Sequence, residues 1–235
     1  MEITPLGDSA LIVRVRDNFE DAPDATLNAV LSLQRRLENA RLPGVLEITS
    51  AYTTVALFFD PIRTINAGAR IEDVFGWLEQ QIRHELSKPV KISVGKTKMV
   101  DVPVCYEPEF ALDLPDVARH AKLEPHQVVD LHCGAEYRVH CVGFTPGFPY
   151  LGGLPQKLAT PRRSVPRKEV PAGSVAIGGN QTGIYPVNSP GGWNVIGRTP
   201  LRLFDPEKKP PTMLVAGDRV RFRAITRAEF GRLSK

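Results

Sequence analysis

Glycine and proline recur in tight clusters along residues 143–199, and these clusters constrain the fold more than any other feature of the sequence. Four segments, FTPGFPYLGG, ATPRRSVPRKEVPAGS, IGGNQTGIYP and NSPGGWNVIGRT, exclude long helices and uninterrupted central strands. Strand-like stretches lie around and between them: YRVHCV, SVAIGG, WNVIG, LRLF and RVRFRAI. Short strands separated by such turns predict a closed barrel or a sandwich.

The first ninety residues have a different pattern, in which strand and helix signals alternate. The helical segments repeat apolar residues at steps of three and four, which is typical of an amphipathic helix with one buried face. The expected helices are Asp24–Ala40 and Arg70–Leu86, and the expected strands are Ser9–Val15, Val45–Ala51, Thr54–Phe59 and Val90–Val94. This order predicts two helices packed on one face of a small antiparallel sheet.

The change of pattern predicts an α+β protein of two domains. We expect a small α/β-sandwich domain over residues 1–90 and a β-barrel domain over residues 91–235. A strand at Met99–Cys105 and two short helices at Leu114–Ala121 and Pro125–Cys133 precede the turn-rich region. In the second helix a proline suits the first turn and Gly134 suits the C-cap.

Composition excludes several classes of protein. The chain is 42% hydrophobic and 24% charged, and no apolar run is long enough to span a membrane. Its three cysteines are odd in number and lack CxxC spacing, so we expect neither a disulfide framework nor a zinc site, and a cytoplasmic location. The net charge is only +4, and PRRSVPRK at 161–168 is too short a basic run to indicate nucleic-acid binding.

Familiar catalytic motifs are missing from the sequence. Residues 178–183 (GGNQTG) are as rich in glycine as a phosphate-binding loop, but Ile184 stands where a P-loop has its lysine. No GxSxG or SxxK motif nominates a nucleophile. His132 lies at a helix C-terminus, where an imidazolium is favoured even without a function, so a catalytic and a structural role both remain open.

The turn-rich region nevertheless carries polar groups that suit anion or amide recognition. Arginine offers a planar fork that matches a carboxylate or a phosphate. Loops stiffened by proline and glycine on a β scaffold can hold such groups in place. The alternative is that a barrel with many turns simply needs many glycines and prolines. The polar groups are Arg162, Arg163, Arg167, Asn180, Gln181, Tyr185, Asn188 and Arg198.

The run from VVDLHCGAEYRVHCVGFTPGFPYLGGLP through SVAIGGNQTGIYPVNSPGGWNVIGRTPLRLFD closely resembles the B-subunit family of the prokaryotic 5-oxoprolinases. This family includes the kinase inhibitor KipI and was formerly called allophanate hydrolase subunit 1. It is also similar to half of the carboxyltransferase domain of urea carboxylase. Weaker matches at PLGDSALIV, LPGVLEITSAY and FFDP extend the resemblance over nearly the whole chain. The resemblance implies a cyclophilin-like β-barrel as the second domain.

The resemblance also implies partners and an activity. With a homologous C subunit and an A subunit, such a chain would open the lactam of 5-oxo-L-proline to L-glutamate using ATP, with Mg²⁺ and with ATP bound by the complex. Two alternatives are a KipI-like protein that binds a histidine kinase and blocks its autophosphorylation, and a biotin-dependent carboxyltransferase half. The chain has no Met-Lys-Met biotin acceptor of its own.

The residues that match the family's motifs receive expected roles. We expect Arg162, Arg163 and Arg198 to bind phosphate or the substrate carboxylate, Gln181 and Tyr185 to orient the amide, and His132 to move a proton. Phe144, Phe148 and Tyr150 are expected to form a wall of the site or of a partner interface. The remaining expected binding residues are Pro146, Arg167, Gly178, Gly179, Thr182, Gly191, Gly192 and Trp193.

Overall fold

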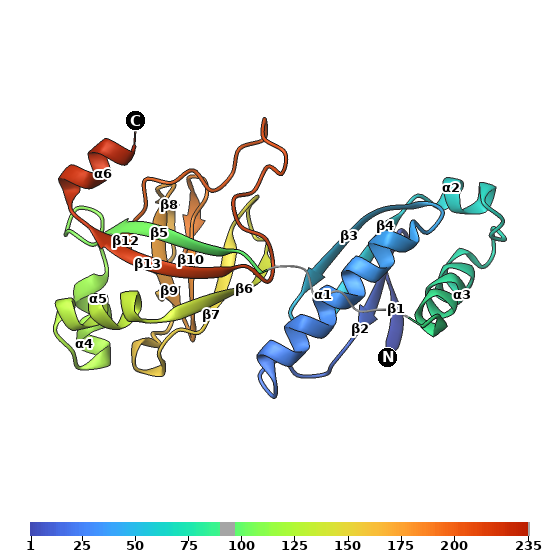
Figure 1. Ribbon diagram of the computed structural model, residues 1–235, viewed down its shortest axis with the longest axis horizontal. Helices are drawn as coiled ribbons and strands as arrows, with labels where there is room; N and C mark the ends of the chain where they lie inside the picture. The colour runs from blue at the N-terminus through green and yellow to red at the C-terminus, as the bar shows by residue number, and fades with distance from the viewer. Residues whose placement is uncertain (90–96, 235) are drawn as a thin grey trace. The chain divides into compact units, whose positions relative to one another are not determined.

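The structure is a computed structural model that describes residues 1–89 and 97–234. Its contacts divide the chain into two compact units, residues 1–96 and 97–235, drawn from blue to teal and from green to red in Figure 1. The strand expected at Val90–Val94 and the expected boundary after residue 90 lie outside the described residues. No helix in the described part of the chain is long and apolar enough to cross a membrane.

The first unit contains a four-stranded antiparallel sheet in the order β1-β2-β4-β3. Helices α1 and α3 pack on the sheet: Val30 and Leu37 of α1 and Leu78 of α3 share a buried core with Val13 and Leu57. The predicted α+β arrangement of this unit is therefore confirmed. The elements are β1 (Glu2–Leu6), β2 (Ala10–Arg14), α1 (Pro23–Ala40), β3 (Val45–Ala51), β4 (Thr54–Phe59), α2 (Pro61–Asn66) and α3 (Val74–Ser87).

Two side-chain caps explain where the structure departs from the expected elements of this unit. Strand β4 ends at Phe59 as expected, but helix α2 directly after it was not expected: the Asp60 carboxylate accepts hydrogen bonds from the backbone N–H groups of Ile62 and Arg63 and starts this helix. The carboxylate of Asp73 accepts from Gly76 N at 3.0 Å, so α3 begins at Val74 and not at the expected Arg70. Strand β1 was not expected.

The second unit is built around a closed seven-stranded barrel in the order β10-β7-β6-β13-β5-β12-β9. Strands β13 and β5 pair in parallel, and the other pairs are antiparallel. The predicted barrel is confirmed. The elements of the whole second unit are β5 (Met99–Cys105), α4 (Leu114–Ala121), α5 (Pro125–Gly134), β6 (Glu136–Val142), β7 (Pro149–Gly152), β8 (Arg167–Val170), β9 (Ser174–Gly178), β10 (Gln181–Ile184), β11 (Ser189–Gly191), β12 (Asn194–Arg198), β13 (Arg219–Ile225) and α6 (Arg227–Leu233).

One expected strand of the second unit is wrong. The LRLF segment at 201–204, between Pro200 and Pro206, forms only an isolated bridge from Phe204 to Thr212. Proline lacks the N–H group that a strand ladder needs, and this prevents the segment from extending its pairing. Helix α6 was not expected; its N-cap is Thr226, whose hydroxyl accepts from Glu229 N.

The barrel strands alternate between two buried clusters. On β9, Val175 and Ile177 belong to the barrel core, whereas Ala176 between them belongs to a second cluster with Phe148 and Trp193. Successive side chains of a strand point to opposite faces, so this second cluster covers the outside of the barrel. The candidate site lies on that outer face.

Candidate functional site

A pocket of about 310 Å³ opens beside the outer-face cluster. The lining residues come from β7 and the loop before it, the loop before β8, the segment after β10, and β11 with the turn that follows it, although these parts are far apart in the sequence. The turn-rich segments that dominate the sequence therefore meet around one cavity. It is lined by Phe144, Phe148, Tyr150, Arg162, Arg163, Pro166, Tyr185, Pro190, Gly191, Gly192 and Trp193.

Phe148 is the centre of an aromatic cluster that forms the pocket wall. Its ring centroid lies 5.0 Å from that of Tyr150, 5.1 Å from Tyr185 and 5.5 Å from Trp193. All three pairs meet edge to face, which suits the ring quadrupoles and adds about 0.5–1.5 kcal/mol per pair beyond area burial. Phe148 is 2% exposed, whereas Phe144 at the rim is 64% exposed. The wall is thus buried at Phe148 and exposed to solvent at Phe144.

Glycines make room for these rings on the barrel surface. A Cβ atom on Gly178 would lie 2.5 Å from the indole of Trp193, and one on Gly183 would lie 2.8 Å from the ring of Phe148. Real Cβ atoms do not approach ring carbons so closely, so any side chain would displace the aromatic ring. The glycine-rich GGNQTG segment therefore serves aromatic packing and a β-hairpin between β9 and β10.

Arg162 is held at the mouth of the pocket by the backbone on both sides of it. The Asn194 amide donates to Pro161 O at 2.8 Å, and Arg163 N donates to Gly192 O at 2.8 Å. The Arg162 guanidinium lies 5.7 Å from the centroid of the Trp193 ring, a cation–π arrangement. It makes no hydrogen bond or ion pair with any residue that the structure describes, so its donors are free for a ligand.

A buried carboxylate holds the neighbouring arginines. Asp113, 1% exposed, accepts from Arg163 Nη1 at 2.7 Å and from Arg167 Nη1 and Nη2 at 2.7 and 2.8 Å. It also accepts from Val195 N at 2.7 Å. The hydrogen bond to Asp113 raises the pKa of Arg167. Two of the three arginines predicted at 161–168 are therefore fixed by the protein itself.

Two tyrosines add hydroxyl groups to the aromatic wall. Burial raises the pKa of both Tyr150 and Tyr185. Both phenols are consequently neutral at physiological pH and can donate a hydrogen bond. The pocket lining therefore combines the free Arg162 cation, the Asp113-bound Arg163 and two neutral phenols with aromatic rings, prolines and glycines.

His132 lies in the barrel interior and not in this pocket. Its Nε2 lies 3.1 Å from Thr182 Oγ1, and its Nδ1 lies 2.8 Å from the Tyr106 hydroxyl. Because Thr182 Oγ1 donates to Ala176 O at 3.0 Å, it accepts from His132 Nε2–H, which leaves Nδ1 to accept from Tyr106. Burial lowers the pKa of His132 to about 3, so the imidazole is neutral. Both of its nitrogens are occupied within the fold.

The structure brings together part of the expected site. Thr182 belongs with His132 in the interior, Gln181 begins β10, Gly179 lies in the hairpin, and Arg198 Nε donates to Ala172 O at 2.8 Å. Pro146 is in the turn before β7, and neither it nor Arg167 lines the pocket. Nine expected residues do line it: Phe144, Phe148, Tyr150, Arg162, Arg163, Tyr185, Gly191, Gly192 and Trp193.

Sequence reasoning missed Asp113, although it organises the arginines. An acidic residue directly before a helix is normally interpreted as an N-cap. Asp113 precedes α4 but makes no side-chain cap bond, and its partners lie 50 and 54 residues further along the chain. No local pattern could have shown that pairing.

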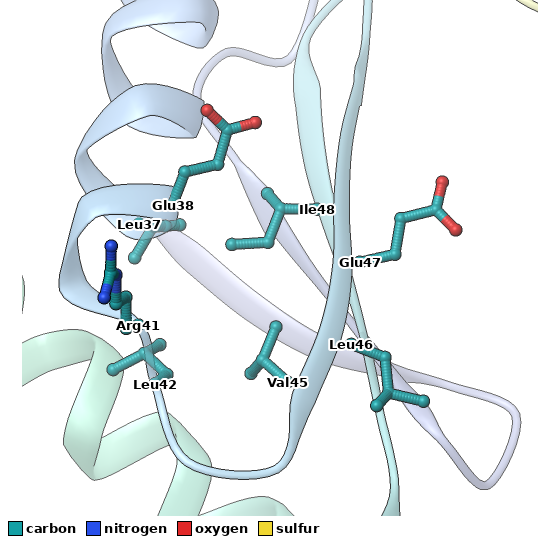
Figure 2. A pocket seen from close by; sticks show the side chains of 8 residues that line it. All are labelled: Leu37, Glu38, Arg41, Leu42, Val45, Leu46, Glu47 and Ile48. Carbon is teal, nitrogen blue, oxygen red and sulfur yellow. The ribbon is translucent and has the colours of Figure 1, made fainter. Parts of the chain in front are cut away.

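A second cavity of about 290 Å³ lies in the first unit, between α1 and β3. Figure 2 shows Val45 and Ile48 directed from β3 into the space between helix and strand, with Glu38 near the end of α1 and Arg41 at its C-cap beside it. Its lining combines aliphatic side chains with one cation and two carboxylates, and it contains no aromatic residue. Across the described residues, no group of three His, Cys, Asp or Glu side chains could hold a metal ion.

Comparison with curated proteins gives relatives that match most of the chain. The chain is 38% identical over 230 residues to the 5-oxoprolinase B subunit of Bacillus subtilis, covering 97% of this chain and 95% of the relative. It is 39% identical over 220 residues to the 5-oxoprolinase B subunit of Escherichia coli O157:H7, covering 92% and 93%. These matches include both units of the fold.

Solved structures show the same architecture. The protein TTHA0988 superposes with a TM-score of 0.75 at 35% identity; the match covers 92% of this chain and 40% of that one. Urea carboxylase of Kluyveromyces lactis shares the fold, with a TM-score of 0.68 at 19% identity over 98% of this chain and 22% of its own. A family model described as carboxyltransferase domain, subdomain C and D, matches residues 1–214. The chain therefore belongs to the carboxyltransferase subdomain C and D family, in the group of the 5-oxoprolinase B subunits.

Proposed function

We propose that this chain is the B subunit of an ATP-dependent 5-oxoprolinase that opens 5-oxo-L-proline to L-glutamate together with a homologous C subunit and an A subunit. The nearly full-length matches to two proteins named as 5-oxoprolinase B subunits support the assignment. One structural observation supports dependence on partners. The pocket lining includes no carboxylate, imidazole, thiol or Ser/Thr hydroxyl, so it offers a binding surface without a general base or a nucleophile.

The reaction explains why such a surface is useful. Resonance stabilises the lactam C–N bond, and ATP would make the ring carbon electrophilic by phosphorylating the lactam oxygen. ADP leaves in this first step. One water then adds to the ring carbon and the C–N bond breaks, which gives the free amine and an acyl phosphate. A second water hydrolyses the acyl phosphate to the new carboxylate and inorganic phosphate. In this scheme the Arg162 guanidinium binds and orients the substrate carboxylate, and Tyr150 or Tyr185 donates a hydrogen bond to the amide.

His132 has a different role in this proposal from the proton shuttle considered from the sequence. Its hydrogen bonds tie α5 to β10 through Thr182, and from there to the carbonyl of Ala176 in β9. Ala176 belongs to the outer cluster beneath the pocket. His132 therefore acts as a positioning residue that fixes the strands on which the pocket is built.

Reconstitution tests the proposed function directly. The chain is co-expressed with its candidate C and A partners, and 5-oxoproline-dependent ADP release is measured for the full complex and with each subunit omitted. We expect activity only when all three are present. Activity that persists without this chain would overturn the assignment.

The family description supports a second candidate, a biotin-dependent carboxyltransferase half. The relevant readout is carboxyl transfer from carboxybiotin to an acceptor, with a biotinylated carrier protein supplied in trans. Transfer that requires this chain, in a complex that releases no ADP with 5-oxoproline, would favour this candidate over the oxoprolinase.

A further inference from the structure

We infer that the outer-face pocket binds a compact ring that bears a single carboxylate, and that the triphosphate of ATP is held elsewhere in the complex. This inference rests on the proposed function for the identity of the acid, the five-membered lactam 5-oxo-L-proline. The ligand class itself follows from charge, backbone hydrogen bonding and size at the pocket.

The charge at the pocket suits one carboxylate. Arg163 and Arg167 share the buried Asp113, and both terminal nitrogens of Arg167 are directed to it. Arg162 is the pocket-lining cation with no ion-pair partner among residues 1–89 and 97–234. A planar guanidinium fork matches a carboxylate, whereas a triphosphate requires several cations or a metal ion.

The backbone offers no cradle for phosphates where the sequence suggested one. A phosphate loop presents free N–H groups, but Gly179 N donates to Thr160 O at 2.8 Å, and Thr160 N donates to Gly179 O at 3.1 Å. Gly178 pairs with Gln181 across the hairpin. The backbone of these glycines pairs with neighbouring segments, and Gly178 packs against the Trp193 indole. The segment therefore cannot surround an anion.

The size and walls of the pocket suit a small flat ring. Its volume of about 310 Å³ lies at the lower end of the range of about 300–1,000 Å³ for small-molecule sites. Five of its eleven lining residues are aromatic, and the Trp193 ring lies beside the free Arg162 guanidinium. A ring stacked on these side chains would place its carboxylate at Arg162 and its amide near the tyrosine hydroxyls.

Trp193 provides the probe for a binding test on the full chain. The sequence has two tryptophans, Trp77 and Trp193, so a Trp77→Phe variant reports from the pocket alone. This variant is titrated with 5-oxo-L-proline, with pyrrolidin-2-one, which lacks the carboxylate, and with MgATP. Calorimetry on the unmodified chain repeats each titration, so the result does not depend on the variant.

We expect saturable binding of 5-oxo-L-proline, binding of pyrrolidin-2-one about 10- to 100-fold weaker, and no saturable response to MgATP. Adding Arg162→Met should weaken the binding of 5-oxo-L-proline by a similar factor and leave the affinity for pyrrolidin-2-one unchanged. The matched control is Arg221→Met, because that exposed arginine on β13 pairs with Asp101 away from the pocket. It should change neither affinity.

Three outcomes would overturn the inference: Arg162-dependent binding of MgATP, equal affinity for the lactam with and without its carboxylate, or no saturable binding of the acid. If the acid shows no saturable binding while the reconstituted complex is active, the inference about the pocket fails and the proposed function is kept. Conversely, binding of the acid by a chain whose omission leaves ADP release intact would preserve the pocket and remove the proposed function.

Discussion

The inside and the outside of the barrel contain polar groups in opposite hydrogen-bonding states, as His132 of α5 and Arg162 of the loop before β8 show. Inside, the hydrogen bonds of His132 run without a gap from Tyr106 to the carbonyl of Ala176. Outside, Arg162 faces the pocket with all its donors free of protein acceptors within the described chain. A buried polar group must be satisfied by the fold, whereas a group reserved for a ligand must not be.

This difference changes which candidate residue is best suited to a role in ligand binding. Histidine is the residue that most often moves protons, and for that reason His132 attracts attention in the sequence. The structure engages both of its nitrogens inside the core and lowers its pKa to about 3. Arg162, one of four cations in a short run, is the group that remains available.

Of the substitutions considered, Asp113→Ala should cause the largest loss in the free energy of unfolding. It would leave Arg163, Arg167 and the buried Val195 N–H without their acceptor. Breaking a buried ion pair from one side costs about 3–5 kcal/mol in the free energy of unfolding. Urea unfolding measures the change. Asp116→Ala is the control, since Asp116 pairs with Arg119 at the exposed surface of α4, and a similar loss there would contradict the argument.

The pH dependence of stability should reveal the buried histidine. Burial lowers the pKa of His132 from 6.5 to about 3, so between these values the unfolded chain binds a proton that the native state excludes. The free energy of unfolding should therefore fall as the pH drops below 6.5, by up to about 1.4 kcal/mol per unit, until about pH 3.

A His132→Gln variant, compared with the native chain by urea unfolding from pH 7 to pH 5, should lose this component of the slope. Over those two units the difference amounts to no more than about 2.8 kcal/mol, and most of it lies below pH 6.5. The same mutation in the exposed His126 is the control. Equal slopes in the native chain and in His132→Gln would show that the imidazole is not excluded from protonation.

Gly178→Ala tests the contact between β9 and the Trp193 indole. The added methyl group would collide with the Trp193 indole, and overpacking of this kind costs about 1–3 kcal/mol. We expect lower stability together with a shifted Trp193 emission in the Trp77→Phe background. The comparison variant is Gly134→Ala, because a Cβ there meets nothing within 4 Å. An unshifted emission in Gly178→Ala would mean that the indole does not rest on β9.

Arg162→Ala should have the smallest effect on the fold and a selective effect on function. Because Arg162 bonds no described residue, its loss should leave urea unfolding within about 0.5 kcal/mol of the native chain. In the assembled complex, 5-oxoproline-dependent ATP turnover should fall about tenfold or more, or about 1.4 kcal/mol of transition-state stabilisation. Arg221→Ala serves as the comparison, because Arg221 pairs with Asp101 and does not line the pocket; full activity in Arg162→Ala would remove Arg162 from the site.

Several parts of this picture follow from local sequence. Leu27, Val30, Leu33 and Leu37 recur at helical spacing, and they are the buried residues of α1. The Gly and Pro clusters at 143–199 correctly predicted short strands, because these residues restrict the backbone where they stand; of the barrel and the sandwich that they left open, the structure shows the barrel. Phe144, Phe148 and Trp193 each lie inside such a turn segment, and the structure places all three at one pocket.

Other features depend on contacts between distant residues and were decided only by the tertiary structure. The arginines between residues 161 and 199 carry the same charge in the sequence, yet Asp113 binds Arg163 and Arg167, a carbonyl binds Arg198, and Arg162 is left free. Likewise, the strand period makes Thr182 and Gly183 neighbours on opposite faces, but only barrel closure places one beside His132 and the other under Phe148. Local sequence determines the conformation of a segment, while the availability of a charged group depends on which partners the fold brings within hydrogen-bonding distance.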